Sequence, residues 1–109
     1  MLGLSKNEQV ALHRLQKELE ANFNLVDFRI FGSKARGDAV KDSDIDVMIE
    51  LENYTPAIES EVDDIIFSIN LEHDTFISAT IFDREELESG PLSESPIYKV
   101  IEREGVRLL

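Results

Sequence analysis

The sequence FGSKARGDAVKDSDIDVMIE, residues 31–50, contains the features from which both the fold and the chemistry of this chain can be inferred. It joins an apolar run at 25–31 to a second apolar run at 45–51. Both runs are rich in β-branched and aromatic residues, which favour strands, and a glycine directly after the first run indicates a turn. We therefore expect two strands, connected by a helical turn at 33–37 and a polar loop at 39–43.

The rest of the chain alternates between segments with helical spacing of apolar residues and one further extended run. Ser5 and Glu8 match a capping box, and Thr55 followed by Pro56 is typical of a helix start. These patterns predict helices at 5–23, 56–71, 83–87 and 97–104, and a strand at 75–82. The order predicts one domain, residues 1–109, of the α/β or α+β class, with a small mixed sheet covered by helices.

Composition excludes several classes of protein. The 109 residues are enough for one domain, and the absence of cysteine excludes disulfides and thiolate metal sites. No apolar run approaches a membrane span, and the first residues lack a signal-peptide pattern, so a cytoplasmic protein is expected. The net charge of −12 argues against non-specific nucleic-acid binding, because such a surface repels phosphate backbones.

The Gly-Ser pair at 32–33 is the first candidate for ligand binding. Glycine allows close approach of the backbone to a ligand, and free N–H groups at Ser33 can bind phosphate oxygens if a helical turn begins there. Lys34 and Arg36 are the nearest cations and are expected to steady a triphosphate. Most Gly-Ser pairs after a strand are ordinary turns, so this pair alone is weak evidence.

Two acids, Asp44 and Asp46, open the second strand. Because side chains alternate along a strand, both carboxylates point to one face, while Ile45 and Val47 point into the core. Paired carboxylates repel unless a cation lies between them, and oxygen ligands suit Mg²⁺. A single Asp-x-Asp is more often a solvated turn, but its combination with the Gly-Ser pair ten residues earlier is much rarer.

The spacing Gly32-Ser33, ten residues, Asp44-x-Asp46 resembles the signature of the DNA polymerase beta-like nucleotidyltransferase superfamily. The strings GSKARG and SDIDV resemble its minimal nucleotidyltransferase (MNT) branch, and the tail IEREGV resembles the closing helix of these short proteins. The resemblance implies about three core strands flanked by helices, two Mg²⁺ ions and an NTP, usually ATP. An acceptor hydroxyl would attack the α-phosphate and pyrophosphate would leave, with Gly32 and Ser33 holding the triphosphate and Asp44 and Asp46 the metals.

The third carboxylate of that family, which is thought to activate the acceptor, has two candidate positions here. The expected strand at 75–82 contains no acid, and Asp74 immediately precedes it. By alternation Asp74 and Ser78 share a face, so Asp74 is our candidate for the catalytic base and third metal ligand. Alternatively, Ser78 occupies that position and the base is missing, with Asp74 a residue of the helix-to-strand turn.

The resemblance also implies a partner, because MNT proteins often work beside a HEPN-domain protein, and some are antitoxins that transfer AMP to its tyrosine. We expect a protein adenylyltransferase of this kind. The competing hypothesis is an inactive nucleotide-binding module that neutralises its partner by contact. Transfer to a small molecule ranks lower, since enzymes of that kind usually carry an additional substrate domain. Self-association stays open.

Overall fold

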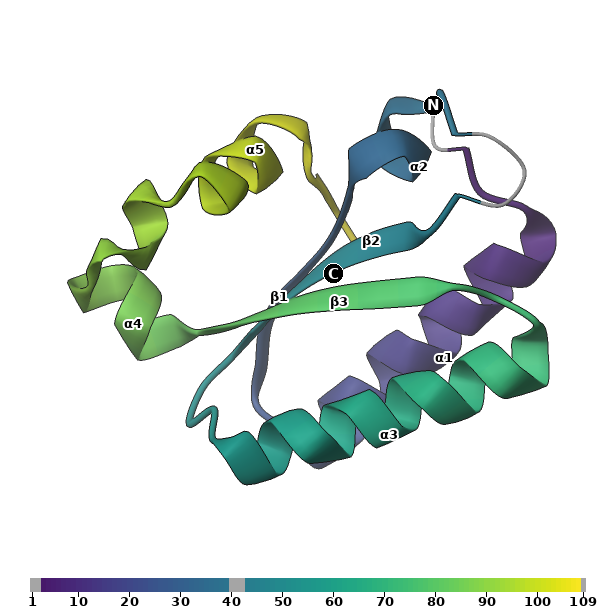
Figure 1. Ribbon diagram of the computed structural model, residues 1–109. Helices are drawn as coiled ribbons and strands as arrows, with labels where there is room; N and C mark the ends of the chain where they lie inside the picture. Colours follow the sequence, from purple (N-terminus) through teal and green to yellow (C-terminus); the bar gives the residue numbers. More distant parts are fainter. Residues whose placement is uncertain (1–2, 40–42, 109) are drawn as a thin grey trace.

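The computed structural model describes residues 3–39 and 43–108. Its elements, in chain order, are α1 (Lys6–Asn22), β1 (Leu25–Phe31), α2 (Gly32–Arg36), β2 (Ile45–Leu51), α3 (Pro56–His73), β3 (Ile77–Asp83), α4 (Arg84–Ser89), the 3₁₀ helix η1 (Pro91–Glu94), α5 (Pro96–Glu104) and β4 (Val106–Arg107). Within the described part, the strands form one sheet in the order β3-β2-β1-β4 (Figure 1). β1 is antiparallel to both its neighbours, and β2 and β3 are parallel. The predicted mixed sheet flanked by helices is confirmed.

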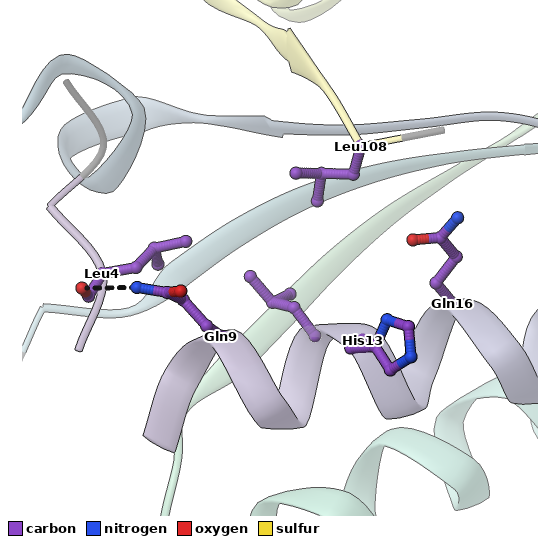
Figure 2. A pocket seen from close by; sticks show the side chains of 6 residues that line it. Leu4, Gln9, His13, Gln16 and Leu108 are labelled. Atoms are coloured by element: carbon purple, nitrogen blue, oxygen red, sulfur yellow. Dashed lines mark hydrogen bonds between the residues drawn. The ribbon is translucent and has the colours of Figure 1, made fainter. Parts of the chain in front are cut away.

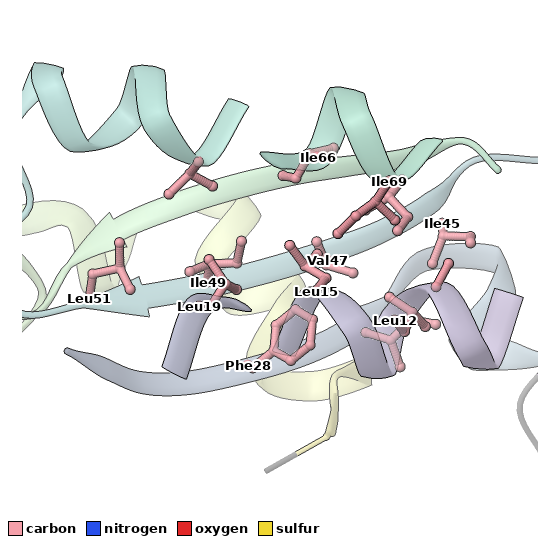
Figure 3. Close-up of a cluster of buried hydrophobic side chains, with 14 residues drawn as sticks. Leu12, Leu15, Leu19, Phe28, Ile45, Val47, Ile49, Leu51, Ile66 and Ile69 are labelled. Carbon is pink, nitrogen blue, oxygen red and sulfur yellow. The ribbon is translucent and has the colours of Figure 1, made fainter. Parts of the chain in front are cut away.

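Helices α1 and α3 lie side by side on one face of the sheet (Figure 1). Both begin as the sequence predicts: the Ser5 side chain accepts from the Glu8 backbone N–H, and the Thr55 hydroxyl accepts from the N–H of Ile58. Their apolar stripes meet alternate residues of β1 and β2 in the main core (Figure 3). Leu15, Leu19 and Ile69 are fully buried there, and each contributes about 1.5–3 kcal/mol.

The opposite face of the sheet is only partly covered. A second, smaller cluster consists of Phe31, Met48, Phe82, Leu87 and Ile101, and it packs α4 and α5 on this face. Ion pairs also hold α5 in place, because the buried Arg29 guanidinium bonds Asp27 on β1 and Glu102 on α5, each at 2.7 Å. The beginnings of β2 and β3 extend beyond this cluster, and their side chains on this face reach solvent.

Two boundaries differ from the prediction in a way that affects the site. Helix α3 continues to His73, and β3 begins at Ile77 instead of residue 75. The Asn70 side chain explains the difference: its Oδ1 accepts from the Ile77 N–H and from the Thr75 hydroxyl, each at 2.9 Å. Asn70 thereby fixes residues 74–76 as a connection between helix and strand.

The chain's tail was predicted to end in a helix, and the structure adds a short strand after it. Val106 pairs with Ile30 and Arg107 with Arg29, which makes β4 the edge strand beside β1. A two-residue strand is too short for its sequence pattern to reveal it. Within the ranges 3–39 and 43–108, no helix is long and apolar enough to cross a membrane.

Candidate active site

Gly32 brings the start of α2 into contact with β2. Its φ is +75°, a conformation that L side chains rarely adopt. A Cβ at this position would overlap Oδ2 of Asp46 and lie 3.3 Å from its Cγ. The register explains this closeness, because Phe31, directly before Gly32, pairs with Asp46 across the β1–β2 ladder. The backbone of the Gly-Ser turn can therefore lie directly beside the Asp46 carboxylate only because residue 32 has no side chain.

Asp44 and Asp46 lie together as the alternation predicts. Asp46 is half-buried between the fully buried Ile45 and Val47, and Asp44 is exposed just before the strand. Burial raises the pKa of the Asp46 carboxyl, the charge of Asp44 raises it further, and Arg36 partly offsets both effects. Two neighbouring carboxylates are a suitable pair of oxygen ligands for Mg²⁺, so these residues fit a divalent cation.

The cations of the motif point in different directions. Lys34 is buried, and its Nζ lies 3.1 Å from Oε2 of Glu8, so it ties α2 to the first turn of α1. Arg36 is exposed and bonds Asp38 at 3.2 Å and Glu104 of α5 at 3.0 Å. Its charge acts on Asp46, as the pKa of that carboxyl shows. Arg36 is therefore better placed than Lys34 to meet a triphosphate held beside Asp46, and phosphate binding by Lys34 stays a prediction.

Ser33 is the other member of the predicted phosphate site. Ser33 is half-buried in the first turn of α2, and no side chain caps this helix. Free N–H groups at a helix start can accept an anion, which agrees with the expected contact to phosphate. The loop residues 40–42 of the motif lie outside the described residues.

Ser78, and not Asp74, is the residue of β3 that pairs with Asp46. In parallel neighbours, paired residues point to the same face, so the exposed Ser78 hydroxyl shares a face with the Asp46 carboxylate. Asp74 is the C-cap of α3, in the left-handed conformation at φ 53°. Among the described residues, no three acids or histidines come together as a metal-binding group. The structure thus does not gather Asp74 with Asp44 and Asp46.

Asp74 lines a different feature, a polar pocket of about 420 Å³ at the starting edge of β2 and β3. The same pocket is lined by Lys34, Ser43 and Phe76, and by residues of the α1 start. It therefore adjoins the acid pair without including it.

Sequence reasoning missed Glu104 as a neighbour of the site. It is far from the motif in sequence, and it reaches Arg36 only because α5 folds back over the sheet. No local pattern around Glu104 would have indicated this contact. Its ion pair with Arg36 makes α5 the element that adjoins α2 at the candidate site.

The pocket drawn in Figure 2 is separate from this site. It has a volume of about 460 Å³ and lies between α1 and the C-terminal segment, and Leu4, Leu12 and Leu108 are among the residues that line it. Gln9 crosses it to donate to the Leu4 carbonyl at 3.4 Å. None of the predicted site residues lines it.

Comparison with known proteins agrees with this geometry. The family model for the nucleotidyltransferase domain matches residues 12–103. Protein adenylyltransferase MntA of Thermococcus cleftensis is 31% identical over 106 residues, which cover 97% of this chain and 96% of that protein.

Solved structures share the fold. The chain superimposes on a structure described as a toxin-antitoxin with AMP-PNP, with a TM-score of 0.61 at 19% identity, covering 93% of this chain and 72% of the other. A protein of Sulfolobus solfataricus described as a nucleotidyltransferase gives a TM-score of 0.53 at 20% identity, covering 98% and 90%. With the family model and the whole-length relative, these findings show that the chain belongs to the nucleotidyltransferase domain family.

Proposed function

We propose that this nucleotidyltransferase uses Mg²⁺ to transfer AMP from ATP to a tyrosine of a HEPN-domain protein, as the antitoxin of a toxin-antitoxin pair. The whole-length similarity to a protein adenylyltransferase supports the reaction, and the shared fold with a toxin-antitoxin structure supports the partner. The observation that carries the proposal is the contact of Gly32 with Asp46. It puts a turn suited to phosphate directly beside a carboxylate suited to a metal.

Each residue of the site has a distinct task in this reaction. Gly32 leaves room for the triphosphate, the Ser33 hydroxyl donates to a phosphate oxygen, and Arg36 exchanges one of its two carboxylate partners for phosphate. Asp44 and Asp46 are the groups that would hold Mg²⁺, which supplies positive charge against the triphosphate when bound. Members of this family generally use an NTP and a divalent metal.

The proposed step is a substitution at the α-phosphorus. The acceptor oxygen forms a bond to that phosphorus, the bond from phosphorus to the bridging α–β oxygen breaks, and pyrophosphate leaves. The phenolic proton passes to solvent, because the residue facing Asp46 on β3 is a serine and not a carboxylate. The residues of this chain thus bind and orient ATP and the acceptor, and they promote the reaction mainly by positioning the two substrates and by their charge.

A labelling experiment tests the proposal directly. The chain is incubated with Mg²⁺, a HEPN-domain protein from the same genome and ATP carrying the label on the α-phosphate. We expect label on one tyrosine of that protein, no label from γ-labelled ATP, and no reaction after EDTA. Stable binding of ATP without transfer under these conditions would instead support the contact-only module.

A substitution at Ser78 separates the two candidates for the third acid. We predict that Ser78→Asp increases the transfer rate about tenfold or more, because a carboxylate facing Asp46 can accept the acceptor's proton. Asp74→Asn should leave the rate unchanged, since this residue ends α3 and is exposed. Rates are measured at saturating ATP and Mg²⁺. A large loss in Asp74→Asn, with no gain in Ser78→Asp, would identify Asp74 as the base.

A further inference from the structure

Phe76 is an exposed aromatic residue beside the acid pair. It lies one residue before β3, and its carbonyl accepts from the Ile45 N–H at 2.8 Å, so it continues the β2–β3 pairing one residue beyond the first pair, Ile45 with Ile77. Its neighbours Thr75 and Ile77 are each 5% exposed, whereas Phe76 is 58% exposed. The alternation therefore directs its ring away from the main core and toward the face of Asp46 and Ser78.

Nothing in the packing of the described residues accounts for this ring. Phe76 belongs to neither apolar cluster, although both contain phenylalanines from β1 and one contains Phe82 of β3. It lines the 420 Å³ polar pocket together with Ser43, the residue before Asp44. The ring is therefore open to a ligand that lies on the β3 side of the acids.

The order of the strands indicates which substrate, the triphosphate or the acceptor, lies on the β3 side of Asp44 and Asp46. The Gly-Ser turn follows β1, the acids lie on β2, and Phe76 and Ser78 lie by β3, so the acids stand between the turn and Phe76. In phosphoryl-type transfer the attacking and leaving oxygens lie roughly in line, on opposite sides of the phosphorus. If pyrophosphate leaves on the side of Gly32 and Ser33, the acceptor must approach over β3.

The chemistry at Ser78 favours an aromatic acceptor. A serine at this position provides no carboxylate to take the acceptor's proton. A phenol, with a pKa of about 10, loses its proton far more readily than an aliphatic alcohol. A tyrosine therefore needs less help from a base than a serine or threonine, and its ring is the group that an exposed phenylalanine can recognise.

We propose that Phe76 is the acceptor-recognition residue, whose ring packs against the ring of the tyrosine that receives the nucleotide. This inference rests on the proposed function and specifies which side of the site the acceptor occupies. An aromatic pair of this kind strengthens binding by a factor of roughly 2 to 10. Its loss should therefore affect binding of the acceptor and leave binding of ATP unchanged.

Two short lysine-flanked peptides, identical except for a single tyrosine or serine, test the proposal as acceptors. We expect the wild-type chain to label the tyrosine peptide preferentially. Phe76→Ala should raise the KM for the tyrosine peptide about five- to tenfold, with kcat and the KM for ATP unchanged. Phe76→Trp should return the KM for this peptide to the wild-type value, because it keeps an aromatic ring at the position. Phe67→Ala is the matched control, because Phe67 is 65% exposed on the outer side of α3.

A binding measurement without turnover complements the kinetics. Saturation-transfer NMR with N-acetyltyrosinamide, in the presence of Mg²⁺ and AMP-PNP, should show contact with the wild-type and Phe67→Ala proteins and clearly weaker contact with Phe76→Ala. A raised KM for ATP in Phe76→Ala would place the nucleobase on this ring and overturn the proposal. Unchanged kinetics, or no preference of the wild-type chain for tyrosine, would overturn it as well. The proposed function fails separately, if the wild-type chain labels no HEPN-domain protein.

Discussion

Asp46→Asn is expected to reduce nucleotide transfer by about 10²- to 10³-fold while the protein stays folded, because it removes one of the two charges that we propose hold the metal. The half-buried Asp46 carboxyl has a raised pKa, caused first by burial and then by Asp44. Its charge therefore opposes folding of the metal-free chain, and the neutral amide should leave the melting temperature equal or higher. Asp44→Asn should lose activity by the same mechanism.

The measurement combines initial rates with thermal unfolding, each with and without Mg²⁺. Wild-type protein should gain melting temperature on addition of millimolar Mg²⁺ and AMP-PNP, since a ligand of the folded state stabilises it. Asp46→Asn should lose most of this gain. Asp64→Asn is the control, because Asp64 is an exposed acid on α3, which packs on the face of the sheet opposite to Asp46. Full activity in Asp46→Asn would remove this residue from the catalytic site.

The acid pair and the glycine turn could be predicted because each depends on local rules. Alternation extended one residue before β2 puts Asp44 on the face of Asp46, and the effect of the Asp44 charge on the pKa of Asp46 agrees with their closeness. A glycine directly after an apolar strand indicates a turn, and the structure adds that Gly32 has φ +75° and contacts Asp46. The structure also adds that the two strands pair directly, as antiparallel neighbours.

The role of β3 could not be predicted, because it depends on how a separate segment aligns with β2. Alternation alone put Asp74 and Ser78 on one face, and only the register shows that Ser78 faces Asp46. The Asn70 side chain, which fixes the start of β3, forms its contacts across a turn that has no clear sequence signature. Lys34 is a similar case. Its place next to the Gly-Ser pair in sequence predicted contact with a triphosphate, but the fold also brings Glu8 close enough to form an ion pair with it.

Gly32→Ala and Gly37→Ala should separate backbone strain from catalytic geometry. Both glycines have positive φ, 75° and 83°, so alanine should destabilise the protein by about 1–2 kcal/mol at either position. At Gly32 the added Cβ also meets Asp46, whose carboxylate must then move. A displacement of about 1 Å in such a group costs roughly 10²-fold in rate. We therefore expect a larger loss of stability in Gly32→Ala than in Gly37→Ala, and a large loss of transfer only in Gly32→Ala.

Denaturant unfolding and transfer rates, measured for both variants, check this pair of expectations. The second substitution Asp46→Ala, added to Gly32→Ala, removes the group that the new Cβ contacts. The stability cost of Gly32→Ala in that background should fall to that of Gly37→Ala, since only backbone strain remains. If Gly32→Ala instead transfers nucleotide at the wild-type rate, the position of the Asp46 carboxylate against the glycine turn is not what the reaction depends on. In that case the phosphate must be held elsewhere on this face of the sheet.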